Sequence, residues 1–146
     1  VLQWLGWVPA LTTSVPMLWH AHEMVFGFAV AVIAGFLFTA ARNWTGEATP
    51  AGLPLAALCA LWLFARVAQL TGPAALAGGA DAAFLLSVAG ALWIPLQKTR
   101  NRNRVLLLFL LLLAGADGLF HLGAGGVLDV SPLTGVRIAL YGVVLL

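Results

Sequence analysis

Three histidines and several carboxylates are the residues of this sequence whose types and spacing suit metal chemistry. His20, His22 and Glu23 are almost consecutive, and Asp117 and His121 are spaced i, i+4. Neutral imidazole binds copper, iron and zinc, and it is also an axial ligand of haem iron. A carboxylate one helical turn from a histidine commonly fixes the tautomer of a metal-bound imidazole. The sequence therefore predicts metal or haem ligation by the three histidines, supported by the neighbouring carboxylates.

The spacing near the first two histidines leaves their arrangement open. On a regular helix His20 and His22 point about 200° apart, so they share one metal only if the helix has not yet begun there. Otherwise they serve two sites, or one of them is structural. His20, Glu23, Met24 and Gly27 share a helical face, and a methionine suits Cu(I). No CxxCH haem-attachment motif is present, so any haem is expected to be non-covalent.

The elements that position these residues follow from the composition. The chain of 146 residues is 62% hydrophobic and only 8% charged, whereas soluble domains carry about 25% charged residues. The mean hydropathy is +1.03. A soluble fold with so few charges would expose large apolar patches and aggregate. Membrane lipid is therefore an expected partner, and the fold is expected to be an all-α bundle of transmembrane helices.

Apolar runs predict where the helices lie, because a span needs about 20 mostly apolar residues. Four full helices are expected over residues 20–41, 53–70, 81–96 and 105–125, with a fifth, truncated, over 132–146. The third run is short and can extend back over 74–80. Residues 1–19, rich in tryptophan and proline, are expected to lie at the membrane interface. The chain is interpreted as one transmembrane domain, and as a fragment of something longer that meets its remaining helices or a second copy.

Basic residues predict the orientation. Lys98, Arg100, Arg102 and Arg104 lie in the loop 97–104, and such short basic loops stay cytoplasmic. The loop is a topology determinant, and no nucleic-acid partner is expected. Alternation then places the N-terminal segment outside. It also gathers most ionisable groups of the helices in one layer near the outer face: His20, His22, Glu23, Arg66, Asp81, Asp117, His121 and Arg137.

This outer layer has more than one interpretation. Ionisable groups within a membrane are costly and usually face the bundle interior, where they mark functional sites. The layer could bind a metal or haem, it could be the substrate or proton site of a transporter or channel, or it could hold only structural ion pairs such as Arg66 with Asp81 or Asp117. No nucleophile–base pair is present, so no reaction is assigned and an enzyme is not favoured.

A longer run of residues carries a family resemblance. The sequence from Trp19 to Phe28, WHAHEMVFGF, resembles the signature of NnrS family proteins. The resemblance continues through Ala34-Gly35-Phe36-Leu37, Asn43-Trp44-Thr45-Gly46, Gly52-Leu53-Pro54-Leu55, and Trp62 with Arg66. It is specific over residues 19–66 and looser from there to the end.

The resemblance implies a function. NnrS proteins are polytopic proteins of the bacterial inner membrane, described as containing haem and copper and linked to nitric oxide metabolism and nitrosative stress. Carried over by position, it points to His20, His22 and Glu23 as site residues. Met24, Gly27, Arg66 and Asp117 are further candidates for contact with the cofactor, and His121 rests on the topology argument. The family has about a dozen helices, and if partner ligands lie in those not included here, this fragment is not expected to bind the cofactor alone.

Overall fold

The computed structural model describes residues 16–100 and 102–145, and this part of the chain is helical with no strand. The elements follow one another as α1 (Pro16–His22), the π-helix η1 (Glu23–Ala29), α2 (Val30–Thr45), α3 (Leu53–Thr71), α4 (Ala74–Lys98), the 3₁₀ turn η2 (Arg102–Arg104), α5 (Val105–Ala124) and α6 (Leu133–Leu145). The predicted all-α fold is confirmed.

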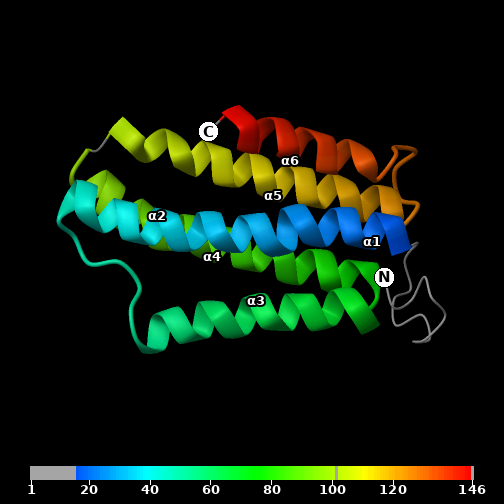
Figure 1. The fold of residues 1–146 in the computed structure, drawn as a ribbon, viewed down its shortest axis with the longest axis horizontal. Coiled ribbons are helices and arrows are strands. Elements are labelled where there is room, and N and C mark those ends of the chain that lie inside the picture. Colours follow the sequence, from blue (N-terminus) through cyan, green and yellow to red (C-terminus); the bar gives the residue numbers. More distant parts are fainter. Residues whose placement is uncertain (1–15, 101, 146) are drawn as a thin grey trace.

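Four of these helical segments are long and apolar enough to cross a membrane. They are Pro16–Thr45, Leu53–Thr71, Ala74–Lys98 and Arg102–Ala124, while α6 is shorter. Successive segments run in opposite directions along the bundle (Figure 1). The central helix is α4, which packs against α2, α3 and α5, and α6 packs along α5. The chain is therefore a bundle of membrane-spanning helices, as its composition predicts.

The first helix begins earlier than the sequence predicts, and the third has the longer of the two extents that the sequence allows. Residues 16–19 form the first turn of α1, although they are expected from the sequence to precede the first helix; the rest of the expected interfacial segment lies outside the described residues. Helix α4 begins at Ala74, seven residues before Asp81. The apolar residues 74–80 thus extend this helix, and Asp81 lies about 10 Å along it from its start.

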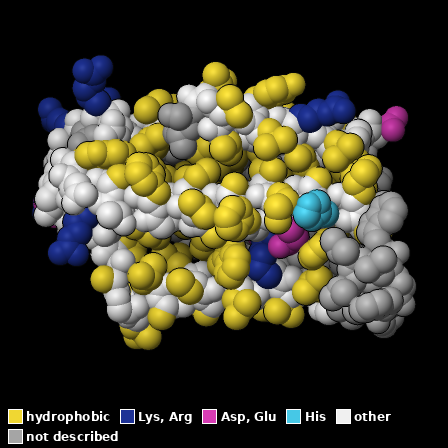
Figure 2. Space-filling view, viewed as in Figure 1, with side chains coloured by type: hydrophobic (Ala, Val, Ile, Leu, Met, Phe, Trp, Pro, Cys, Tyr) yellow, Lys and Arg dark blue, Asp and Glu magenta, His cyan; other side chains and the backbone are white. Residues whose placement is uncertain are grey.

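The two ends of the bundle differ in charge. The turn after α2 and the C-terminus of α4 lie at one end, where Lys98 Nζ is 2.7 Å from Glu47 Oε1. Basic side chains gather at that end (Figure 2). At the opposite end, Pro16, Ala74 and Leu133 begin their helices. The predicted separation of the basic loop from the histidine-bearing end is therefore present in the fold.

The core between the two ends is hydrocarbon. Leu85, Val88 and Leu92 of α4 pack with Leu110 and Leu113 of α5, and each of these side chains is at most 2% exposed. Large apolar side chains cover the outer surface as well (Figure 2). A bundle that is apolar on both its inside and its outside is stable only in a lipid environment.

Candidate metal centre

The π-helix η1 positions the first two polar residues of the centre. His22 ends α1 and Glu23 begins η1, and the next buried residues are the consecutive Val25, Phe26 and Gly27. A π-helix makes more residues per turn than an α-helix and occurs frequently at functional sites. In this structure three consecutive residues of the π-helix are buried in the bundle interior. A regular α-helix would point consecutive side chains in directions about 100° apart.

His22 is enclosed by aromatic rings and carboxylates. Its ring centroid lies 5.0 Å from that of Phe26 and 4.5 Å from that of Phe120. Its Nε2 is 2.8 Å from Asp117 Oδ1 in a buried hydrogen bond, and its Nδ1 is 3.4 Å from Glu23 Oε1. The side chain has no exposed surface. Both ring nitrogens are therefore directed by carboxylates from different helices.

Asp81 of α4 lies at the middle of the polar group. Its Oδ2 is 3.7 Å from His22 Nε2 and 3.8 Å from His121 Nε2, while its Oδ1 accepts a hydrogen bond from Arg66. Asp81 is 2% exposed, so α4 carries a carboxylate into the bundle interior. Because α4 is the central helix, this carboxylate reaches residues of α1, α3 and α5 at once.

Arg66 of α3 connects two of the carboxylates. Its Nη1 donates to Glu23 Oε1 at 2.6 Å, and its Nη2 donates to Asp81. Gly27 leaves the space that this ion pair occupies, because a Cβ there would lie 2.7 Å from Glu23 Oε2 and 2.8 Å from Arg66 Nη1. Trp62, one turn before Arg66, donates from Nε1 to the Gly27 carbonyl at 3.0 Å. Together these contacts join α3 to the π-helix.

His121 completes the group from α5. Its Nε2 is 3.5 Å from Asp117 Oδ1, one turn earlier on the same helix. Its ring packs against Gly78 of α4, where a Cβ would lie 2.7 Å from the ring atom Cγ. The ring centroids of His121 and His22 are 5.1 Å apart, with the rings edge to face. The glycine thus allows the two histidines to approach the same carboxylates.

The four residues His22, Asp81, Asp117 and His121 converge on one small volume. Each offers a ligand atom, and these atoms all lie within 4.8 Å of one another. We call these four residues the buried centre. Asp81 Oδ2, Asp117 Oδ2 and His121 Nε2 are buried and find no hydrogen-bond partner among the described residues. Unpartnered buried polar atoms are unusual, and Asp81 Oδ2 lies 3.7 Å from His22 Nε2 and 3.8 Å from His121 Nε2, a spacing that leaves a place for a cation.

Comparison with known proteins identifies the family. The model of the NnrS protein family matches residues 1–146, which is the whole chain. The chain belongs to the NnrS family. No curated protein and no solved structure matched it.

The donor set indicates what kind of cofactor the buried centre fits. Two imidazoles and two carboxylates, with ligand atoms within 4.8 Å, suit a single borderline metal ion such as Cu(II), Zn²⁺ or Fe(II). Haem does not fit between His22 and His121, because ring centroids only 5.1 Å apart leave no room for the iron and a ligand bond on each side of it. The buried centre could therefore hold a metal ion, and it has no room for a macrocycle.

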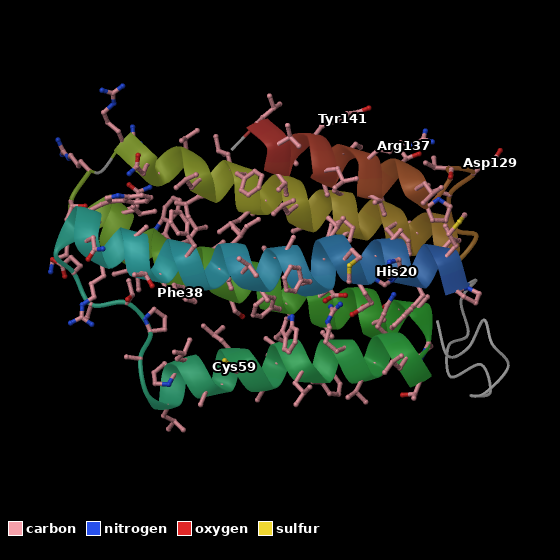
Figure 3. The ribbon with its side chains drawn as sticks, in the orientation of Figure 1. His20, Phe38, Cys59, Asp129, Arg137 and Tyr141 are labelled. Atoms are coloured by element: carbon pink, nitrogen blue, oxygen red, sulfur yellow. The ribbon has the colours of Figure 1, made fainter. Side chains whose placement is uncertain are left out.

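The structure brings together most of the residues singled out from the NnrS sequence. His22, His121 and Asp117 belong to the buried centre, Glu23 and Arg66 contact it, and Gly27 makes room for their ion pair. The exceptions are two. His20 is exposed on the outer face of α1 (Figure 3), and Met24 is 49% exposed. His20 and His22 thus lie on different sides of one helix, and the structure does not bring His20 or Met24 to the buried centre.

Sequence reasoning does not identify Asp81 as a member of the site. The apolar runs place it at the first residue of the third helix, as a structural ion-pair partner of Arg66. That pairing is present, but the second carboxylate oxygen of Asp81 faces both histidines. The sequence places Asp81 in the same layer as Asp117, but depth alone does not show that its side chain points toward the histidines.

Proposed function

We propose that this NnrS protein binds copper at the buried centre and a non-covalent haem elsewhere, and that it acts in nitric oxide metabolism or the response to nitrosative stress. One observation carries the metal part of this proposal. The polar group in the bundle interior sets three carboxylates against one guanidinium and two imidazoles, and the unpartnered Asp81 Oδ2 lies 3.7 Å and 3.8 Å from Nε2 of the two histidines.

The charge balance can be counted from the contacts. Glu23, Asp81 and Asp117 supply three carboxylates, and Arg66 supplies one guanidinium. With ionised carboxylates and neutral histidines the group carries two negative charges in excess. Uncompensated charge within a membrane is costly. A divalent cation among the four ligands of the buried centre would neutralise the excess and satisfy the unpartnered oxygens.

The residues around the ligands support the same assignment. Metal-bound histidines commonly place their second ring nitrogen against a carboxylate. Glu23 occupies this position beside Nδ1 of His22 and is itself held by Arg66. A bound copper ion would supply a Lewis-acidic, redox-active centre. The chain itself fixes the imidazole of His22 through Glu23, encloses the centre with buried side chains, and supplies Arg66 as a counter-charge to the carboxylates.

The competing hypothesis of a transporter or channel finds less support. A transported ion or proton would need polar groups along the rest of the bundle. Between the buried centre and the basic end, the core positions of the described helices are occupied by Leu85, Val88, Leu92, Leu110 and Leu113. A single polar layer above a hydrocarbon core favours a fixed cofactor site.

The proposal includes a location and partners. We propose that the protein lies in the bacterial inner membrane, with the loop 97–104 cytoplasmic and the N-terminal segment periplasmic. Apart from lipid, the proposed partners are the remaining helices of a longer chain or a second copy. A groove of about 500 Å³ beside Gly78, Gly79, Gly118 and His121 offers a surface of small residues for such a helix.

Metal analysis of the purified full-length protein tests the buried centre. We expect one equivalent of tightly bound copper, and we expect Asp81→Asn, Asp117→Asn and His121→Gln each to lose it. Asp129→Asn is the matched control, since Asp129 is an exposed carboxylate at the same end of the bundle and should leave the copper in place. Elution position in size-exclusion chromatography checks that each variant is folded. Wild-type protein without bound metal, or variants that all retain it, would contradict the assignment.

Visible spectroscopy of the same proteins tests the haem part separately. We expect a Soret band in the wild-type protein that survives Asp81→Asn, because the buried centre has no room for haem. A protein without a chromophore would overturn the haem assignment and leave the copper assignment to stand or fall on the metal analysis. Loss of the Soret band in His20→Gln would identify the exposed histidine as a haem ligand.

A further inference from the structure

A second set of metal-ligand side chains lies outside the buried centre, on the outer face of the first helix. Met17 is 64% exposed, Met24 is 49% exposed, and His20 between them is exposed. Two sulfur atoms lie along this helix on either side of the labelled His20 (Figure 3). The chain contains only two methionines, and both are in this set. We call these three residues the outer stripe.

The spacing of the outer stripe places its side chains on one helical face. His20 follows Met17 by three residues and precedes Met24, in the first turn of the π-helix, by four, and all three side chains are exposed, so they lie on the outward side of the first helical segment. The same face continues with the exposed Phe28 and Val32. A long, unbranched methionine on either side of an imidazole can turn its sulfur toward it, because the methionine side chain is flexible.

The outer stripe is separate from the buried centre in both position and chemistry. His22, two residues after His20, has no exposed surface and faces the bundle interior. The buried centre offers imidazole and carboxylate, which suit a divalent ion. The outer stripe offers two thioethers and one imidazole with no carboxylate, and soft donors of this kind select Cu(I). His20 is exposed, so its imidazole is accessible on the outer face of the first helix.

We propose that Met17, His20 and Met24 form a binding site for a soft monovalent cation, Cu(I), on the outer face of the first helix. The site is distinct from the buried centre. This proposal rests on the proposed function in one respect, namely that the protein binds copper. The stripe lies at the same end of the bundle as the buried centre, so the first helix would present a soft site on its outside and a harder site on its inside.

Cu(I) titration of the full chain in lipid nanodiscs tests this proposal. The titration is performed anaerobically with a chromophoric Cu(I) chelator as competitor, and Ag(I) serves as a redox-inert probe. We expect the double variant Met17→Leu/Met24→Leu, and separately His20→Gln, to lose one Cu(I) or Ag(I) equivalent. Leucine preserves the apolar surface, so these variants retain the fold. Phe28→Leu, on the same exposed face, is the matched control and should bind as the wild type does.

A second variant separates this proposal from the proposed function. In Asp117→Asn the buried centre is disrupted and the outer stripe is intact, so Cu(I) binding at the stripe should persist while copper at the buried centre is lost. X-ray absorption of the Cu(I)-loaded Asp117→Asn protein should show sulfur scattering that disappears when both methionines are replaced. Unchanged Cu(I) affinity in the methionine double variant, or a site with no sulfur ligand, would overturn the proposal. It would also be overturned if His20→Gln removed a haem band and no Cu(I).

Discussion

Nε2 of His22 and Oδ1 of Asp117 lie 2.8 Å apart, although the two residues are 95 positions apart in the chain. The contact joins the first helix to α5 in the bundle interior, where neither side chain has exposed surface. Arg66 makes the equivalent connection for α3 and α4 through Glu23 and Asp81. Four membrane-spanning segments are thus held together by one polar layer within an otherwise apolar bundle.

The first prediction concerns the guanidinium of this layer. Replacing Arg66 by methionine leaves Glu23 and Asp81 without their counter-charge in a buried position. Removing one partner of a buried ion pair costs about 3–5 kcal/mol. We therefore expect Arg66→Met to lower the free energy of unfolding by an amount of this order, measured by thermal or denaturant unfolding in detergent micelles.

Lys98→Met provides the control for this prediction. Lys98 pairs with Glu47 at 2.7 Å, but its side chain is 66% exposed. Exposed ion pairs contribute about 0–1 kcal/mol, so this variant should unfold close to the wild type. Equal losses in the two variants would show that burial of the Arg66 network does not stabilise the bundle.

The second prediction compares two glycines of the first span. A Cβ at Gly27 would lie 2.7 Å from Glu23 Oε2, whereas a Cβ at Gly35 would meet nothing within 4 Å. Alanine favours a helix by about 1 kcal/mol over glycine, so Gly35→Ala should be neutral or stabilising. Gly27→Ala must displace the Glu23–Arg66 ion pair, and overpacking costs about 1–3 kcal/mol. We expect Gly27→Ala to unfold at a lower temperature than Gly35→Ala, and the reverse order would be evidence against an ion pair packed on Gly27.

The third prediction concerns orientation in the membrane. In a Cys59→Ser background, Val127→Cys and Arg102→Cys place single thiols at exposed positions at opposite ends of α5. The basic loop is expected to be cytoplasmic, so a membrane-impermeant maleimide added to intact spheroplasts should label only the thiol at position 127. Lysis should then expose position 102. Labelling of position 102 in intact spheroplasts would invert the topology.

The sequence predicts the architecture well because its signal is strong. Apolar runs of span length and one cluster of basic residues identify the helices and place the histidine-bearing end opposite the basic loop. The gathering of His22, Asp117 and His121 follows, since ionisable groups at the same depth of a bundle converge on its interior. The histidines and carboxylates by themselves predict metal or haem ligation, and the family resemblance is what points to haem together with copper.

Other features of the site depend on tertiary structure that the sequence does not reveal. The 3.6-residue period of an α-helix groups His20, Glu23 and Gly27 on one face. The structure has a π-helix at Glu23–Ala29, which changes the faces that residues share, and His20 lies apart from the other two. The sequence leaves the start of α4 open, because the apolar residues 74–80 can either extend the helix or precede it, and in the structure they extend it. For that reason the sequence does not identify Asp81 as a ligand.

The fourth prediction uses two adjacent glycines of α4 to test how His121 is positioned. A Cβ at Gly78 would lie 2.7 Å from His121 Cγ and 3.0 Å from its Cβ, while a Cβ at Gly79 would meet nothing within 4 Å. Gly78→Ala must therefore move the imidazole relative to Asp81 and Asp117, whereas Gly79→Ala gains the same helix propensity without a steric conflict. Because displaced supporting contacts typically weaken metal affinity by about 10–100-fold, we expect Gly78→Ala to bind copper at the buried centre that much more weakly. Competition titration with a Cu(II) chelator measures the difference, and identical affinities in the two variants would exclude His121 as a ligand held in place by this contact.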